Sequence, residues 1–207
     1  MGRYSVRQRR GLAPLLLLVL AAFTGSVGAQ NRSYHESRGV YLGGAVAYHK
    51  MTGEFYQLNQ ETSDAPALFF ETGYRMGGPL RAGFRIFTSV HDLNNSQFSA
   101  DRFRFYGLEF NGRLLLRWRS RLRPYFLLGY AGVGLVAGND EGYRGFGYSF
   151  AAGIEFWLHP NLTLLTEIDV RYIEFDRLQI GNERRTIAGT NPGSMVGFNL
   201  LGLSWHF

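Results

Sequence analysis

The stretch Gly202-Leu203-Ser204-Trp205-His206-Phe207 ends the chain. Its apolar residues, Leu203, Trp205 and Phe207, alternate with polar ones, which predicts a β-strand with one apolar face. Such a strand can face either the core of a soluble sheet protein or a membrane, because both cover one face of the sheet. The rest of the chain has to distinguish the two cases.

The first 29 residues have the three parts of a secretory signal peptide. Residues 1–10 hold four arginines and no acid, an apolar run extends from Leu12 to Phe23, and small residues stand at Val27-Gly28-Ala29. We expect cleavage after Ala29 and a single mature domain over residues 30–207. The apolar run of twelve residues is shorter than the roughly 20 that a transmembrane helix needs, so an N-terminal anchor is the weaker alternative.

Charge and cysteine content exclude several classes of function. The formal charge of +6 falls to +2 without the signal peptide, because four of the 22 basic residues lie in it and all 16 acids lie outside it. The mature chain is therefore not basic enough to indicate nucleic-acid binding, and we expect none. The chain has no cysteine, which rules out thiolate metal sites and cysteine nucleophiles. No motif indicates a cofactor, a metal site or a catalytic set.

Eight segments of the mature chain alternate as strands do. Short turns containing Gly, Pro or Asn follow the second, fourth and sixth strands, whereas long polar loops follow most of the others. This arrangement is typical of an outer-membrane barrel, with turns and both termini in the periplasm and loops outside the cell. We therefore predict an all-β fold, an eight-stranded antiparallel transmembrane β-barrel in the cell outer membrane. The expected strands are 39–49, 67–75, 80–90, 103–117, 125–136, 146–158, 162–175 and 195–207.

The faces of most strands follow from the alternation. In the third strand Leu80, Phe84 and Ile86 face the lipid, and Arg81 and Arg85 face the lumen. Residues 125–136 are apolar at both parities, so their register stays open. Aromatic residues near the strand ends predict two interfacial girdles. We expect the girdles to comprise Tyr74, Trp118, Phe156, Trp205 and Phe207 at one rim, and Tyr48, Phe103, Phe105, Tyr148 and Tyr172 at the other.

The inward parity carries nearly balanced charge. Five acids and six arginines predict an ion-pair network, because an unpaired charge in a narrow lumen costs several kcal/mol. Eight strands enclose a lumen that side chains just fill, so we expect no wide pore. The predicted network comprises Glu71, Arg75, Arg81, Arg85, Glu109, Arg113, Arg117, Glu155, Glu167, Asp169 and Arg171.

With these features the chain resembles the small eight-stranded outer-membrane barrels, represented by the OmpA transmembrane domain and OmpX. The resemblance covers residues 30–207 and rests on the loop alternation, on Arg123-Pro124-Tyr125-Phe126, on Gly153-Ile154-Glu155-Phe156 and on the terminal residues Gly202, Trp205 and Phe207. It implies that these three terminal residues are an assembly signal for the barrel-assembly machinery. Leu200 stands where such signals favour a polar residue.

The family includes adhesins, structural proteins, small channels and lipid-modifying enzymes, so the fold does not choose a function. We expect a monomeric structural or adhesive protein in contact with outer-membrane lipid and lipopolysaccharide. Its candidate surface-loop contacts are Arg177, Arg184 and Arg185. The alternatives are a narrow channel or small-ligand conduit, and an enzyme that modifies lipid A, for which the nearest candidates are Ser89 and His91. Those two side chains share the inward parity, away from the bilayer.

Overall fold

The computed structural model describes residues 38–52, 64–92, 102–137, 141–180, 183–187 and 192–207. The predicted signal peptide, residues 1–29, lies outside the described residues and stays a prediction. None of the described segments is a helix that could span a membrane.

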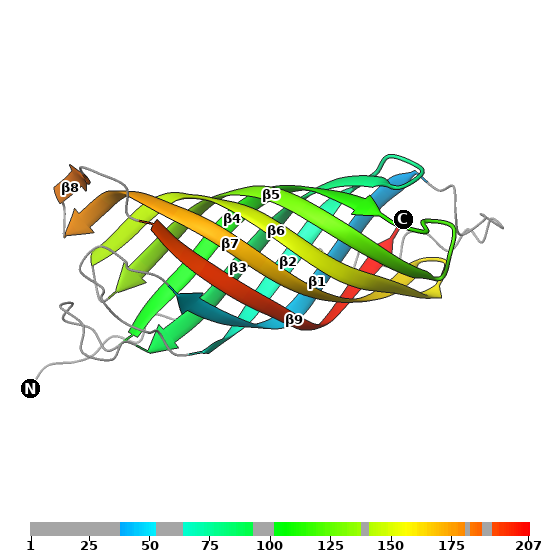
Figure 1. The fold of residues 1–207 in the computed structure, drawn as a ribbon, viewed down its shortest axis with the longest axis horizontal. Coiled ribbons are helices and arrows are strands. Elements are labelled where there is room, and N and C mark those ends of the chain that lie inside the picture. The colour runs from blue at the N-terminus through cyan, green and yellow to red at the C-terminus, as the bar shows by residue number, and fades with distance from the viewer. Residues whose placement is uncertain (1–37, 53–63, 93–101, 138–140, 181–182, 188–191) are drawn as a thin grey trace, which may run out of the picture. The chain divides into compact units, whose positions relative to one another are not determined.

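Eight long antiparallel strands form one closed sheet (Figure 1). Each strand pairs with the next along the chain. The last strand pairs with both the first and the seventh, which leaves no open edge among the eight. The strands are β1 (Gly39–Thr52), β2 (Ala65–Arg75), β3 (Leu80–Asp92), β4 (Arg102–Leu115), β5 (Leu122–Ala137), β6 (Glu141–His159), β7 (Leu162–Ile180) and β9 (Pro192–His206).

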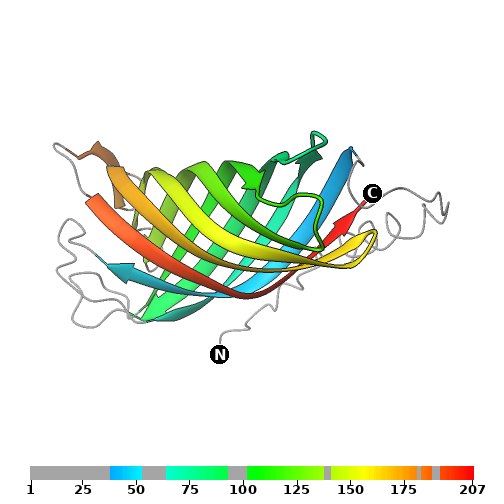
Figure 2. The same cartoon turned by 45° about the vertical axis from the view of Figure 1, so that its right-hand side comes forward.

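A ninth, short strand was not expected. β8 (Glu183–Thr186) pairs with the end of β7, so part of the segment between the expected strands 162–175 and 195–207 is a hairpin that extends β7 to Ile180. The tight connections between β2 and β3, β4 and β5, and β6 and β7 lie at the opposite end of the barrel (Figure 2). We call these two ends the loop end and the turn end.

The faces of the strands agree with the predicted alternation. In β3, Leu80, Phe84 and Ile86 are exposed on the outer face, whereas Arg81 and Arg85 are buried inside. β5, which the sequence left open, turns Phe126, Leu128, Tyr130 and Val136 outward. Tyr125, Leu127, Ala131, Val133 and Leu135 point inward.

The prediction for the aromatic girdle at the loop end is wrong for two of its five residues. Phe103 and Phe105 are buried in the lumen, while Tyr48, Tyr148 and Tyr172 are exposed as expected. The strand period explains the difference, because Phe103 and Phe105 share the parity of the inward-facing Glu109. Aromatic residues at a strand end therefore do not all belong to the girdle.

Candidate functional site

The lumen holds a group of buried, hydrogen-bonded polar side chains, and Glu71 on β2 lies at its centre. Arg85 donates to Glu71 Oε2 from Nη2 at 2.8 Å and from Nε at 3.1 Å. Arg113 Nη2 donates to both oxygens at 2.9 and 3.0 Å, and the Tyr41 hydroxyl donates at 2.6 Å. All four side chains are buried, so one carboxylate is held by two guanidinium groups and a phenol.

Arg85 joins this carboxylate to a second one across the lumen. Its Nη1 and Nη2 donate to Glu167 on β7 at 2.7 and 3.2 Å. Tyr125 and Asn199 donate to the same carboxylate at 2.8 and 2.7 Å. Glu167 has no other ion pair among the described residues, so Arg85 is the group that compensates its buried negative charge.

A second cluster lies closer to the turn end. Arg81 forms a bidentate pair with Glu155, at 2.6 and 2.8 Å, and Trp157 Nε1 donates to Glu155 at 2.5 Å. The guanidinium groups of Arg75 and Arg123 lie 4.8 and 4.5 Å from the centre of the Trp157 ring. A cation over an aromatic face is stabilised by the ring quadrupole, which suits groups that lie away from water.

Arg117 does not belong to the network, contrary to the sequence prediction. β4 ends at Leu115, and Arg117 is exposed in the following turn with a φ of 49°. Arg123 is buried in the lumen instead, so the lumen still holds six arginines against five acids. The alternation in the sequence extended this strand to Arg117, two residues beyond its observed end at Leu115. Arg123 shares the parity of the inward-facing Tyr125, so the sequence would place it in the lumen once the register of β5 is known.

Toward the loop end, the ion pairs of the lumen give way to aromatic contacts. Arg171 donates to Glu109 from Nε and Nη2 at 3.2 and 3.0 Å, and its Nη2 lies 3.2 Å from Asp169. The Arg171 guanidinium also lies 4.0 Å from the centre of the Phe87 ring. Phe87 marks the start of a different layer of the lumen.

This layer is mainly apolar, and the sequence did not predict it. Buried apolar side chains from the loop-end halves of the strands pack together inside the barrel. They include Met51, Phe69, Phe87, Phe103, Phe105, Val133, Leu135, Tyr143, Ile173, Phe175 and Met195. The lumen therefore holds ion pairs toward the turn end and a packed hydrophobic cluster toward the loop end.

Tyr41 shows how the lumen accommodates its large side chains. An added Cβ at Gly73 or Gly83 would lie 2.6 Å from the Tyr41 hydroxyl. Only glycine leaves room there for the ring that donates to Glu71. The inward glycines that the sequence shows among the charged residues thus leave space for the network.

Ser89 and His91, the candidates for a lipid-modifying enzyme, point into the lumen as their parity predicts. The Ser89 hydroxyl lies 2.9 Å from His91 Nε2 and 3.3 Å from His49 Nδ1. All three side chains are buried, and the His91 ring stacks on Phe103 with 5.0 Å between ring centres. The group cannot reach a lipid ester in this arrangement. Among the residues that the structure describes, no cluster of three or more His, Asp or Glu side chains could hold a metal.

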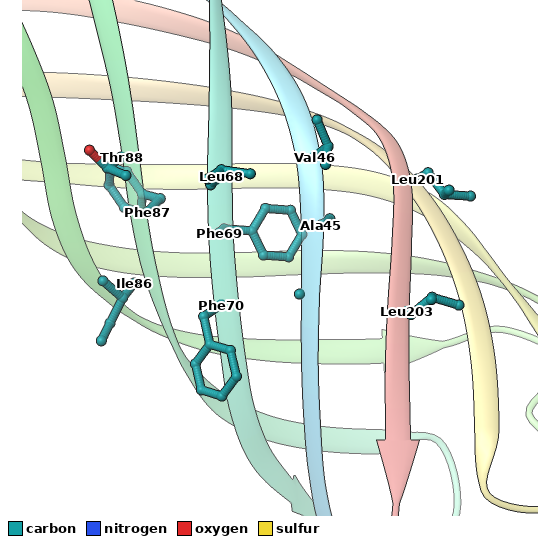
Figure 3. Close-up of a pocket in the computed structure, with 11 residues that line it drawn as sticks. Ala45, Val46, Leu68, Phe69, Phe70, Ile86, Phe87, Thr88, Leu201 and Leu203 are labelled. Atoms are coloured by element: carbon teal, nitrogen blue, oxygen red, sulfur yellow. The ribbon is translucent and has the colours of Figure 1, made fainter. Parts of the chain in front are cut away.

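The lipid-facing surface has a hollow of about 550 Å³ over β1, β2, β3 and β9. Figure 3 shows its apolar lining, which includes Val46, Leu68, Phe70, Leu201 and Leu203. A bulge opposite Val46 and Ala47 turns both Leu200 and Leu201 outward. No charged side chain of the described residues lines the hollow, so it could contact lipid acyl chains but offers no ion pair to a lipid headgroup.

The remaining sequence candidates lie at the two ends. Gly202 and Trp205 are in β9, which closes the barrel, and the Phe207 amide donates to Val40 at 3.0 Å. Arg177 lies in β7 opposite Thr186 of β8, and Arg184 and Arg185 lie in β8. All three arginines are exposed on a hairpin, not on an irregular loop.

Comparison with solved structures shows the same fold in other bacterial proteins. The crystal structure of Neisserial surface protein A superposes with a TM-score of 0.61 at 18% identity, covering 83% of this chain and all of that one. OprG from Pseudomonas aeruginosa gives 0.55 at 13% identity, covering 84% and 97% of the two chains. AlkL gives 0.54 at 15%, covering 88% and 95%. No curated protein matches the sequence.

The sequence itself assigns the family. The family model described as outer membrane protein beta-barrel domain matches residues 15–207, which is most of the chain. The closed eight-stranded sheet with an apolar outer face and a charged interior has the form that this assignment requires. The chain belongs to the outer membrane protein beta-barrel domain family and is an integral protein of the outer membrane.

Proposed function

We propose that this protein serves a structural or adhesive role at the cell surface, through its loop end and not through its lumen. The observation that carries the proposal is the filled interior: buried ion pairs span the middle of the barrel, and the apolar layer follows them. In an eight-stranded barrel packed in this way, the loops and hairpins outside the membrane are the parts available to bind a partner.

The β7–β8 hairpin is the proposed contact. Arg177, Arg184 and Arg185 give it three exposed guanidinium groups, of which Arg185 pairs with Glu183 at 2.6 Å and Arg177 with Asp176 at 3.5 Å. Such exposed pairs contribute little and exchange readily. An anionic ligand, such as a polysaccharide sulfate or a lipopolysaccharide phosphate, can therefore compete for the arginines.

The test compares cells that carry the protein with cells that carry a triple variant, Arg177→Ala, Arg184→Ala and Arg185→Ala. We expect the variant to lose most binding to an immobilised sulfated polysaccharide at low salt, with unchanged surface amounts of the protein. A matched control replaces Arg117 and Arg119, which lie in an exposed turn at the other end. Equal adhesion by the triple variant would remove the hairpin from the proposal.

A narrow conduit is the second candidate. Several buried polar atoms in the lumen, including Asn111 Oδ1, Asn199 Oδ1 and Arg171 Nη1, have no hydrogen-bond partner among the residues that the structure describes. Such groups commonly bind water, and a file of water could carry protons or small ions. Planar-bilayer recording separates the candidates: we expect no stable nanosiemens steps from the filled barrel, and regular steps would favour the conduit.

We further propose that the protein is not an enzyme, since the buried position of Ser89 and His91 supports no reaction at the lipid surface. Mass spectrometry of lipid A from cells with and without the protein should give identical acylation patterns. A monomeric state and recognition of Gly202, Trp205 and Phe207 by the barrel-assembly machinery are the remaining parts of the proposal. Truncation of the last three residues should lower the amount of folded barrel in the outer membrane.

A further inference from the structure

A second groove on the outer wall differs from the apolar hollow because it has a charged end. It has a volume of about 530 Å³ and lies across β4, β5, β6 and β7. Leu108, Gly132 and Phe146 line its apolar part, and Arg144, Asp176 and Arg177 line its part toward the loop end. The groove thus joins the apolar wall to a cluster of ionic side chains.

The apolar part follows from the cross-strand register. Leu108 pairs with Gly132, and Gly132 pairs with Phe146, so the three residues form one row on the outer face. Leu108 and Phe146 are exposed, and a Cβ added at Gly132 would meet nothing within 4 Å. The glycine therefore leaves a slot between two apolar side chains, wide enough to receive part of an acyl chain.

The charged part contains two arginines directly opposite each other. Arg144 on β6 pairs in register with Arg177 on β7, and both side chains are exposed. Like charges at opposed positions of a sheet repel each other. Asp176 Oδ2 lies 3.5 Å from Arg177 Nε and offsets one of the two charges, which leaves the pair with a net positive charge.

A bulge fixes this arrangement. The register between β6 and β7 shifts between Arg144 and Gly145, where Asp176 is the extra residue. A Cβ at Gly145 would collide with the backbone carbonyl of Glu174, so the close approach of the strands requires glycine there. The bulge places Asp176 and Arg177 together on the wall of the groove.

We propose that this groove binds a phosphorylated lipid of the outer leaflet, of the lipid A class, with its phosphate on Arg144 and Arg177 and an acyl chain in the slot at Gly132. Guanidinium groups bind phosphate oxygens through paired hydrogen bonds, and an anion between the two arginines relieves their repulsion. The apolar part of the groove faces the bilayer, where acyl chains are the available ligands. The groove shares Arg177 with the proposed hairpin contact, so this inference rests in part on the proposed function, but it does not involve Arg184 or Arg185.

The test titrates the purified full-length mature protein, in non-ionic detergent micelles, with bisphosphorylated lipid A. We expect Arg144→Gln with Arg177→Gln to weaken binding at least tenfold, because two charge-assisted contacts are lost. The matched control, Arg117→Gln with Arg119→Gln, removes the same charge from an exposed turn at the other end of the barrel and should change binding less than twofold. Gel mobility with and without boiling confirms that each variant is folded.

A second pair of variants tests the slot. Gly132→Leu fills it and should weaken lipid A binding, whereas Gly112→Leu adds the same side chain to another outward glycine with open space around it and should leave binding unchanged. Dephosphorylated lipid A should bind at least tenfold more weakly than the phosphorylated form. The proposal is overturned if the Arg144 and Arg177 variant or the Gly132 variant binds like the wild type, or if inorganic phosphate displaces lipid A at equal concentration.

Discussion

Replacing Arg85 with methionine tests whether the lumen network holds the barrel together. Arg85 pairs with Glu71 at 2.8 Å and with Glu167 at 2.7 Å. Without it Glu71 keeps Arg113, whereas Glu167 keeps, among the described residues, the hydrogen bonds from Tyr125 and Asn199 but no ion pair. One carboxylate is then buried without a directly paired counter-charge.

The expected cost follows from that single uncompensated charge. Removing one partner of a buried ion pair destabilises a protein by about 3–5 kcal/mol. Adding Glu167→Gln to Arg85→Met removes the stranded charge, so the double variant should recover about 1–3 kcal/mol relative to the single variant. The methionine fills part of the space of the guanidinium stem, which limits the contribution of a cavity.

The measurement is urea-induced unfolding of the protein refolded into lipid vesicles, followed by tryptophan fluorescence. The control is Arg102→Met, because the pair of Arg102 with Asp92 at 2.7 Å is exposed at both side chains, by 72% and 59%. That variant should lose less than about 1 kcal/mol. The reasoning is refuted if Arg85→Met costs no more than Arg102→Met, or if the double variant is as unstable as Arg85→Met alone.

Three further predictions address packing and the closed sheet. Phe87→Ala removes a buried ring from the apolar layer and should lower the free energy of unfolding by about 3–5 kcal/mol in the same urea assay. Gly83→Ala should cost about 1–3 kcal/mol because its Cβ meets the Tyr41 hydroxyl, whereas Gly112→Ala, with open space around it, should cost nothing measurable. The wild-type membrane fraction should change mobility on a gel after boiling, because a closed barrel resists detergent until heated, and an unchanged mobility would contradict the fold.

The sequence alone determined the features that repeat with the strand period. Inward and outward faces follow from alternation along each strand, so Glu71, Arg81, Arg85, Glu109, Arg113, Glu155, Glu167, Asp169 and Arg171 were placed in the lumen correctly, as was Arg75. The number of barrel strands and the alternation of turns and loops are local properties as well. They depend on residues close together in the chain, which a reader of the sequence can see.

Which of these charges meet depends on how the strands close into a barrel. Arg81 and Glu155 are 74 residues apart, and their pairing depends on the stagger of the closed sheet. Three local features also depend on the folded chain. The turn after β4 exposes Arg117, the bulge at Gly145 shifts the register of β7 by one residue, and the pairing of β5 determines which of its two faces is inward. No periodic pattern in the sequence specifies these features. The apolar layer and the groove at Arg144 and Arg177 arise where such local irregularities meet across strands, because closure brings together side chains that are distant in the sequence.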